Sequence, residues 1–119
     1  MNAALYVQVC RCEIADVWVD RNAHEIAESL VEHLNAQGVP VRLGSCPDDR
    51  ISSVFAGGSG CSVAMLFDVI AIETGTRWKI EDAGVVNFIK QSPEQWAAEE
   101  LQLKVALAAW AKEVEAGNG

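Results

Sequence analysis

The most regular hydrophobic pattern lies near the carboxyl end of the chain, where residues 92–116 predict one long helix. Ser92 is a suitable N-cap, Pro93 fits the first helical position, and Gln95 occupies the capping-box position. At about 100° of rotation per residue, the large apolar side chains form a single stripe. Its members are Trp96, Leu103, Leu107, Trp110 and Val114. We expect this stripe to face the core.

A second apolar face lies on the opposite side of the same helix. It consists of Ala98, Leu101, Val105, Ala108 and Ala109. One interpretation is a plain surface, because alanines are good helix formers and single exposed apolar side chains are ordinary. The other is an interface, because the small residues around Leu101 and Val105 let a second helix approach closely. The simplest partner is a two-fold symmetry mate, so the sequence predicts a homodimer.

An earlier helix is predicted over residues 23–37. Asn22 offers an N-cap, Glu25 stands at the capping-box spacing, and Gly38 follows the last periodic residue as a stop. The apolar residues between them fall on one stripe, with glutamates on the opposite side. We expect this helix to pack on one face and to meet water on the other.

Two segments have the pattern of strands. Residues 5–13 alternate in polarity, and residues 14–19 would extend that strand after a bend. Residues 62–74 carry apolar side chains in both alternating sets, which predicts a central strand covered on both faces. Gly75 then permits a tight reversal into residues 76–81, which are expected to form the second arm of a hairpin.

The connecting segments are less regular. Residues 39–43 predict a short β segment, which together with the preceding helix suggests a βαβ-like start. Residues 51–55 fit one short helical turn, and a glycine loop follows at residues 57–60. Residues 85–89 fit a strand and a helical turn equally, so the pattern leaves their state open.

These elements predict an α+β fold in the order β-α-β, loop, β-β, α. It would have a mixed sheet of about four strands, one early amphipathic helix and a long C-terminal helix. The chain has 119 residues, of which 50% are hydrophobic, and this fits a single compact domain over residues 1–119. If residues 62–74 are a doubly covered strand and only two substantial helices exist, a second subunit would cover one face.

Charge narrows the classes of partner. Nine basic residues stand against seventeen acidic ones, for a formal net charge of −8. Nucleic-acid affinity comes largely from Lys and Arg, so direct nucleic-acid binding is disfavoured, whereas an acidic surface suits a basic partner protein. The first residues lack the pattern of a signal peptide, and no run of about eighteen apolar residues occurs. We therefore expect a soluble cytoplasmic protein that does not enter a membrane.

Four cysteines are present, Cys10, Cys12, Cys46 and Cys61. Without a signal peptide they are better interpreted as reduced thiols than as a disulfide framework. Cys10 and Cys12 would share one face of a strand and supply half of a soft-metal site, but no second pair stands at a zinc-like spacing. The prediction is buried thiols that pack as small hydrophobic groups, with no metal and no cofactor.

Asp68 interrupts the apolar segment between Leu66 and Ile70. A lone buried carboxylate is costly, so within a covered strand Asp68 must be paired, protonated or lining a polar cavity. The other interpretation is a bulge that places it at the surface.

Function is weakly specified, because no catalytic motif is evident in the sequence. The leading hypothesis is a small acidic, non-enzymatic binding or interaction protein that acts as a homodimer or through its C-terminal helix. The alternative is a small-molecule-binding domain, or a small enzyme, with a pocket between sheet and helix. That pocket would be lined by Asp68, Trp78, Trp96 and Trp110. The same tryptophans would also fit an ordinary core.

Overall fold

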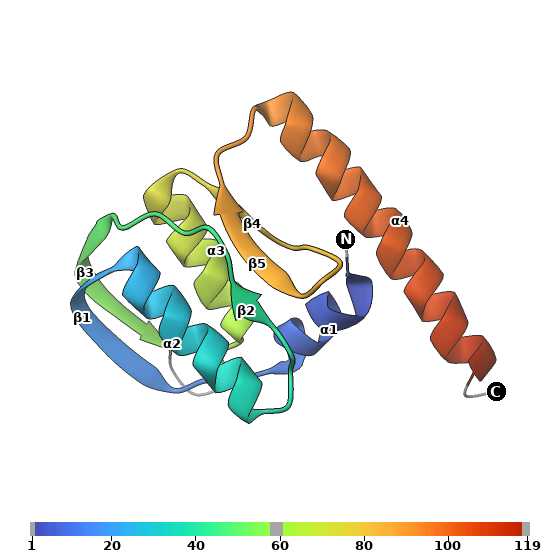
Figure 1. Ribbon diagram of the computed structural model, residues 1–119, viewed down its shortest axis with the longest axis horizontal. Coiled ribbons are helices and arrows are strands. Elements are labelled where there is room, and N and C mark those ends of the chain that lie inside the picture. Colours follow the sequence, from blue (N-terminus) through green and yellow to red (C-terminus); the bar gives the residue numbers. More distant parts are fainter. Residues whose placement is uncertain (1, 58–60, 118–119) are drawn as a thin grey trace.

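The computed structural model describes residues 2–57 and 61–117, and this part of the chain contains four helices and five strands (Figure 1). The helices are α1 (Ala3–Arg11), α2 (Ala23–Ala36), α3 (Val63–Thr74) and α4 (Pro93–Gly117). The strands are β1 (Asp16–Asn22), β2 (Arg42–Leu43), β3 (Arg50–Gly57), β4 (Arg77–Ile80) and β5 (Val85–Ile89). Within these residues, no helix is both long enough and apolar enough to span a bilayer.

The α+β class is confirmed, but the predicted single mixed sheet of about four strands is wrong. The described strands form two separate sheets. One has the order β2-β5-β4, with β2 parallel and β4 antiparallel to β5, and the other is the antiparallel pair β1-β3. Because β1 and β2 lie in different sheets, the βαβ-like start is also wrong. Residues 85–89, whose state was open, form the central strand β5.

Residues 5–13 were expected to be a strand, but most of them belong to α1. The Asn2 side chain caps this helix by accepting a hydrogen bond from the Leu5 amide at 3.1 Å. Leu5 and Val9, four residues apart, then lie on one buried face. Apolar residues four apart fit the two-residue period of a strand as well as the period of a helix, which is about 3.6 residues. Alternation alone therefore led to the wrong prediction.

Residues 62–74, expected to be the central strand, form α3. Ser62 is its N-cap, with Oγ accepting from the Met65 amide at 3.1 Å, and Gly75 ends it with φ of 67°. These residues are apolar almost all round, so the strand and helix periods could not be separated by pattern. Residues 62–74 therefore provide no buried strand that a second subunit would have to cover.

Residues 51–55 were expected to form a helical turn but lie within β3, which pairs with β1 from Asp16↔Gly57 to Asn22↔Arg50. The predicted hairpin of residues 62–74 and 76–81 is also wrong in its first arm, because β4 pairs with β5 instead. The predicted glycine loop extends over residues 58–60, which lie outside the described residues.

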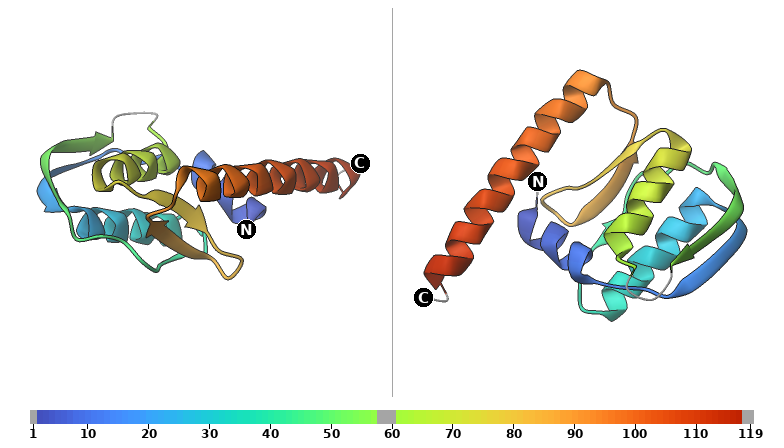
Figure 2. Two further views of the ribbon diagram at one scale, coloured as in Figure 1. Left: turned by 90° about the horizontal axis from the view of Figure 1, so that it is seen from above. Right: turned by 180° about the vertical axis from the view of Figure 1, so that it is seen from behind.

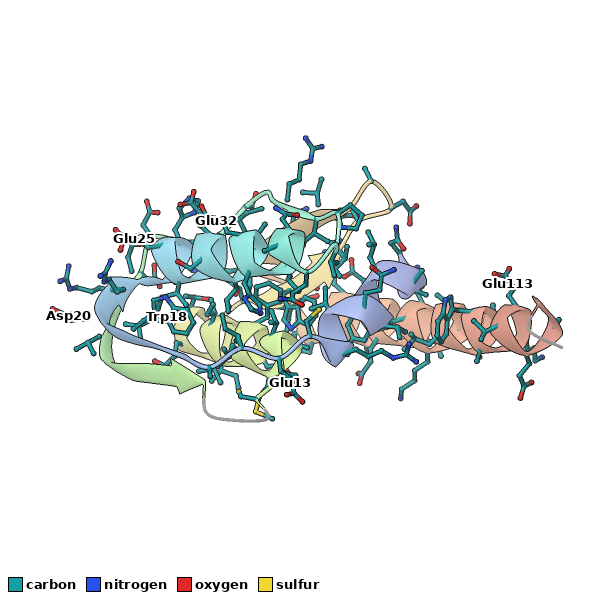
Figure 3. All side chains as sticks on the ribbon, turned by 90° about the horizontal axis from the view of Figure 1, so that it is seen from below. Glu13, Trp18, Asp20, Glu25, Glu32 and Glu113 are labelled. Atoms are coloured by element: carbon teal, nitrogen blue, oxygen red, sulfur yellow. The ribbon has the colours of Figure 1, made fainter. Side chains whose placement is uncertain are left out.

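The predicted helix at residues 23–37 is confirmed as α2. Its Asn22 cap accepts a hydrogen bond from the Glu25 amide at 2.8 Å, and Gly38 follows with φ of 86°. The side chains of Glu25 and Glu32 point outward from this helix, whereas Trp18 of β1 points into the space between α2 and α3 (Figure 3). The amphipathic pattern thus gave both the position and the facing of α2.

The core lies between α2, α3, α1 and the three-stranded sheet. Its largest fully buried side chains are Phe67, Ile26, Leu30, Leu34, Ile70, Ile80, Val9, Val63 and Val86. Phe67 of α3 meets Phe88 of β5 edge-on, with ring centroids 5.5 Å apart. This contact fixes α3 on the sheet and so sets where the outward side of α3 faces.

The long C-terminal helix is confirmed as α4, and it runs along one edge of the fold beside α1 and the β4–β5 hairpin (Figures 1 and 2). Ser92 and Gln95 form the expected reciprocal cap, with bonds of 3.2 and 3.0 Å. The stripe of large apolar residues was expected to be core-facing, but no residue of α4 is buried. Trp96, Leu103, Leu107 and Trp110 are half-buried, and Val114 is exposed. The inner stripe therefore forms a wall beside the core.

Candidate ligand-binding cleft

A cleft of about 340 Å³ lies where α4 approaches the body of the fold. It is lined by Tyr6 of α1, Asp68, Ala71 and Ile72 of α3, Arg77 and Trp78 of β4, and Trp96, Glu100 and Leu103 of α4. Four elements thus contribute to one concavity, and its volume is at the lower end of the usual range for small-molecule pockets. Three aromatic rings and three charged groups meet there.

Asp68 and Trp78 are joined by a short hydrogen bond. The Trp78 indole Nε1–H donates to Asp68 Oδ1 at 2.6 Å. Trp78 is only 7% exposed, so this bond satisfies a donor that water could hardly reach. Asp68 itself lies on the exposed side of α3, and the expectation of an acid inside a covered strand is wrong. No bulge was needed, because the helix turns Asp68 outward while Leu66, Phe67 and Ile70 stay buried.

Two aromatic neighbours hold Trp78 in place. Tyr6 stacks on it with ring centroids 5.4 Å apart and an interplanar angle of 16°, and Phe67 meets it at 5.1 Å and 54°. Burial, reinforced by the negative charges of Cys10 and Asp68, raises the pKa of Tyr6 to about 12. The phenol therefore stays neutral well above pH 10, and the carboxylate of Asp68 contributes a negative potential beside it.

Two charged groups on the cleft lining, Arg77 and Glu100, make no ion pair with the described residues. The Arg77 guanidinium carbon lies 4.9 Å from the centroid of the Trp96 ring, a cation–π contact that joins β4 to α4. Within residues 2–57 and 61–117, the side chains of Arg77 and Glu100 make no hydrogen bond or ion pair. With Asp68 included, the cleft carries two carboxylates and one guanidinium.

An ion pair fastens α4 beside this cleft. Lys79 Nζ of β4 donates to Glu99 Oε1 of α4 at 2.8 Å, and both side chains are about four-fifths covered. Burial opposes ionisation of Glu99, but the hydrogen bonds from Lys79 and Gln91 outweigh it and lower the pKa of Glu99. The hydrogen bond to Glu99 likewise raises the pKa of Lys79.

Of the four residues proposed from the sequence as pocket lining, the structure brings Asp68, Trp78 and Trp96 together. Trp110 does not line this cleft, because it lies farther along α4, where the guanidinium of Arg11 sits 5.9 Å from its ring centroid. The sequence reasoning missed Tyr6, Arg77 and Glu100. Tyr6 was missed because α1 was taken for a strand.

The proposed interface residues on the opposite side of α4 are all exposed. Ala98, Leu101, Val105, Ala108 and Ala109 make up this outer face. Leu101 and Val105 are each 63% exposed, which is high for large apolar side chains.

The cysteines do not gather into a metal site. Cys10 and Cys12 lie on α1 and at its C-cap, so the shared strand face does not exist. Within the described part of the chain, no group of three or more His, Cys, Asp and Glu side chains is arranged to hold a metal ion. Cys10 is exposed and the other three thiols are half-buried, so the expectation that all four are buried is wrong.

Comparison of the chain with protein-family models, with curated proteins and with solved structures gives no match.

Proposed function

We propose that this chain is a small-molecule-binding protein whose cleft takes an organic cation, a primary ammonium group on a short apolar body. The observation that carries the proposal is the pairing of two carboxylates, Asp68 and Glu100, with aromatic walls in one concavity. The ammonium would bind between these carboxylates, and the apolar body would rest against Trp96, Ile72 and Leu103.

Charge supports a cation over an anion. The cleft carries two negative groups against one positive group, and the whole chain has a formal charge of −8. Asp68 Oδ1 accepts the hydrogen bond from the Trp78 indole, and Oδ2 can accept from a second donor. Glu100 is exposed and makes no ion pair with the described residues, so its carboxylate can accept from a ligand, and an ammonium offers three donors in one compact group.

Apolar surface supports a ligand with a hydrophobic part. Ile72 is 74% exposed, the most exposed of the large hydrophobic residues described, and it stands on the cleft wall formed by α3. Leu103 and Trp96 are half-buried on the facing wall formed by α4. A ligand body between the two walls would remove apolar area from water on both sides.

The test uses 2-phenylethylamine and its uncharged analogue 2-phenylethanol, titrated into the purified chain by calorimetry at pH 7. For so small a probe, we expect a dissociation constant on the order of 0.1–1 mM. The alcohol should bind at least tenfold more weakly. The amine should also shift the Trp78 indole signal in a nitrogen–proton NMR spectrum, because that N–H is bonded to Asp68.

Three variants locate the binding. Asp68→Asn keeps an acceptor for Trp78 and should weaken amine binding about tenfold, whereas Asp48→Asn makes the same charge change in an exposed loop and should leave it unchanged. Arg77→Gln should tighten binding several-fold, because it removes the one positive charge of the cleft. The same substitution removes the contact with Trp96, so amide exchange of α4 is measured alongside to show that the helix keeps its place. Equal binding of amine and alcohol, or weaker binding of the amine to Arg77→Gln with α4 in place, would contradict a cation site.

A further inference from the structure

We propose that the outer face of α4 is the surface by which two copies of this chain pair, with their α4 helices antiparallel. The site is separate from the cleft, because the cleft uses the inner residues Trp96 and Leu103 together with Glu100. The proposal rests on the sequence and exposure of α4 and does not require that the cleft bind a ligand.

A regular seam runs along this outer face. Its positions follow the alternating spacing of four and three residues that is typical of helix pairing: Glu94, Ala98, Leu101, Val105, Ala108 and Lys112. At about 100° per residue these six positions fall within a sector about 80° wide. All six are exposed, so nothing in the described part of the chain covers them.

The seam is symmetric about Leu103. In an antiparallel pair whose two-fold axis passes beside that position, Leu101 of one copy meets Val105 of the other. Moving outward, alanine meets alanine, because Ala98 faces Ala108. At each end, Glu94 faces Lys112. One two-fold operation therefore places large apolar residues at the centre, small residues around them and opposite charges at both ends.

Charge selects this orientation over a parallel one. A parallel pair would place Glu94 against Glu94 and Lys112 against Lys112, which is repulsive at both ends. The antiparallel pair replaces both repulsions by two identical Glu94–Lys112 attractions. The complementarity is to the chain itself, and this identifies a second copy as the occupant.

The seam also sets the strength of the pairing. Only Leu101 and Val105 are large, and the seam runs over 18 residue steps from Glu94 to Lys112, about 27 Å of helix. Lys104 lies on the flank close to the axis, where it would approach its own counterpart. A contact of this size is small for a permanent dimer. We therefore expect a dissociation constant in the micromolar range.

The experiment is sedimentation velocity of the whole chain from about 1 to 500 µM in 50 mM salt. Glu94→Lys should weaken the dimer at least tenfold, because it turns both end attractions into repulsions. Glu113→Lys changes the net charge equally but lies off the seam, so it should leave the dimer unchanged. The exchange Glu94→Lys with Lys112→Glu should restore the dimer, although it places each charge unfavourably for the helix dipole. Leu101→Glu with Val105→Glu should abolish it.

Circular dichroism of every variant shows that α4 remains helical. A wild-type chain that stays monomeric to 500 µM would overturn the proposal. So would equal effects of Glu94→Lys and Glu113→Lys, or failure of the charge exchange to restore the dimer. A dimer that survives the Leu101 and Val105 substitutions would place the interface elsewhere and would also overturn it.

Discussion

The ionisation of Tyr6 offers a direct measurement of the environment of the cleft. The chain contains one tyrosine, so the rise in absorbance near 295 nm on alkaline titration reports this residue alone. The structure places its pKa at about 12, against an ordinary 10.0, mainly because the phenol is partly buried against Trp78. At pH 11 only about a tenth of Tyr6 should be ionised, where about nine-tenths of a free tyrosine would be.

Two variants separate the causes of this raised pKa. Asp68→Asn removes one negative charge and should lower the pKa of Tyr6, and Cys10→Ala should lower it as well, because it removes the charge and the hydrogen bond of that thiol. Neither variant should return the pKa to 10.0, because burial is the largest cause. Urea-unfolded chain is the reference, and its tyrosine should titrate near 10.

The sign of the accompanying change in stability follows. Between pH 10 and 12 the unfolded chain has lost the phenolic proton and the folded chain has kept it, so the free energy of unfolding must fall as pH rises. A folded chain whose tyrosine titrates near 10, as in urea, would refute the stacked and partly buried position of Tyr6. The negative potential assigned to the cleft would then lose one of its supports.

Two further predictions test a close backbone approach in the β4–β5 turn and the ion pair beside the cleft. Gly84 has φ of 85°, and a Cβ there would lie 2.8 Å from the Pro40 carbonyl oxygen, whereas Gly38 has φ of 86° and open space around it. Gly84→Ala should therefore cost at least about 1 kcal/mol more in urea unfolding than Gly38→Ala, and equal costs would refute the close approach. Glu99→Gln removes the ion pair with Lys79 and should speed amide exchange in the first half of α4, while global stability falls by less than about 1 kcal/mol. Because the pKa of Glu99 is lowered in the folded chain, the same loosening should appear in the wild type as pH falls below about 4.5 and be absent from Glu99→Gln.

The sequence predicted the two helices with complete end signals. Both α2 and α4 have a side-chain cap and a periodic apolar stripe, and α2 is also followed by a glycine. These signals predicted both helices to within about a residue of their observed ends. The equivalent signals for α3 are Ser62 and Gly75, but the alternation of apolar residues led to the prediction of a strand and a hairpin turn there. End signals were thus the better guide, because they report backbone hydrogen bonding, whereas an apolar segment reports only burial.

The cleft could be predicted only in part. Trp78 and Trp96 were chosen as large aromatic rings, and that choice did not depend on the state of α3. Asp68 was chosen as an acid within a supposed covered strand, and it lines the cleft although that strand is a helix. Tyr6 depends on the state of α1, and Arg77 and Glu100 depend on how α4 lies against β4. Such positions come from contacts between distant segments, which the periodicity of a single segment does not encode.

The two faces of α4 explain why the cleft and the proposed interface occur on one helix. A helix that completed the core would bury its inner stripe, yet Trp96 and Leu103 remain half-buried. Near the cleft α4 is held by the ion pair of Lys79 with Glu99 and by the contact of Arg77 with Trp96, both on the β4 side. Because these contacts hold α4 against β4, concave space remains between it and α3, and this space is the cleft. The outer seam is turned away from that space, so a second copy could pair there without closing it.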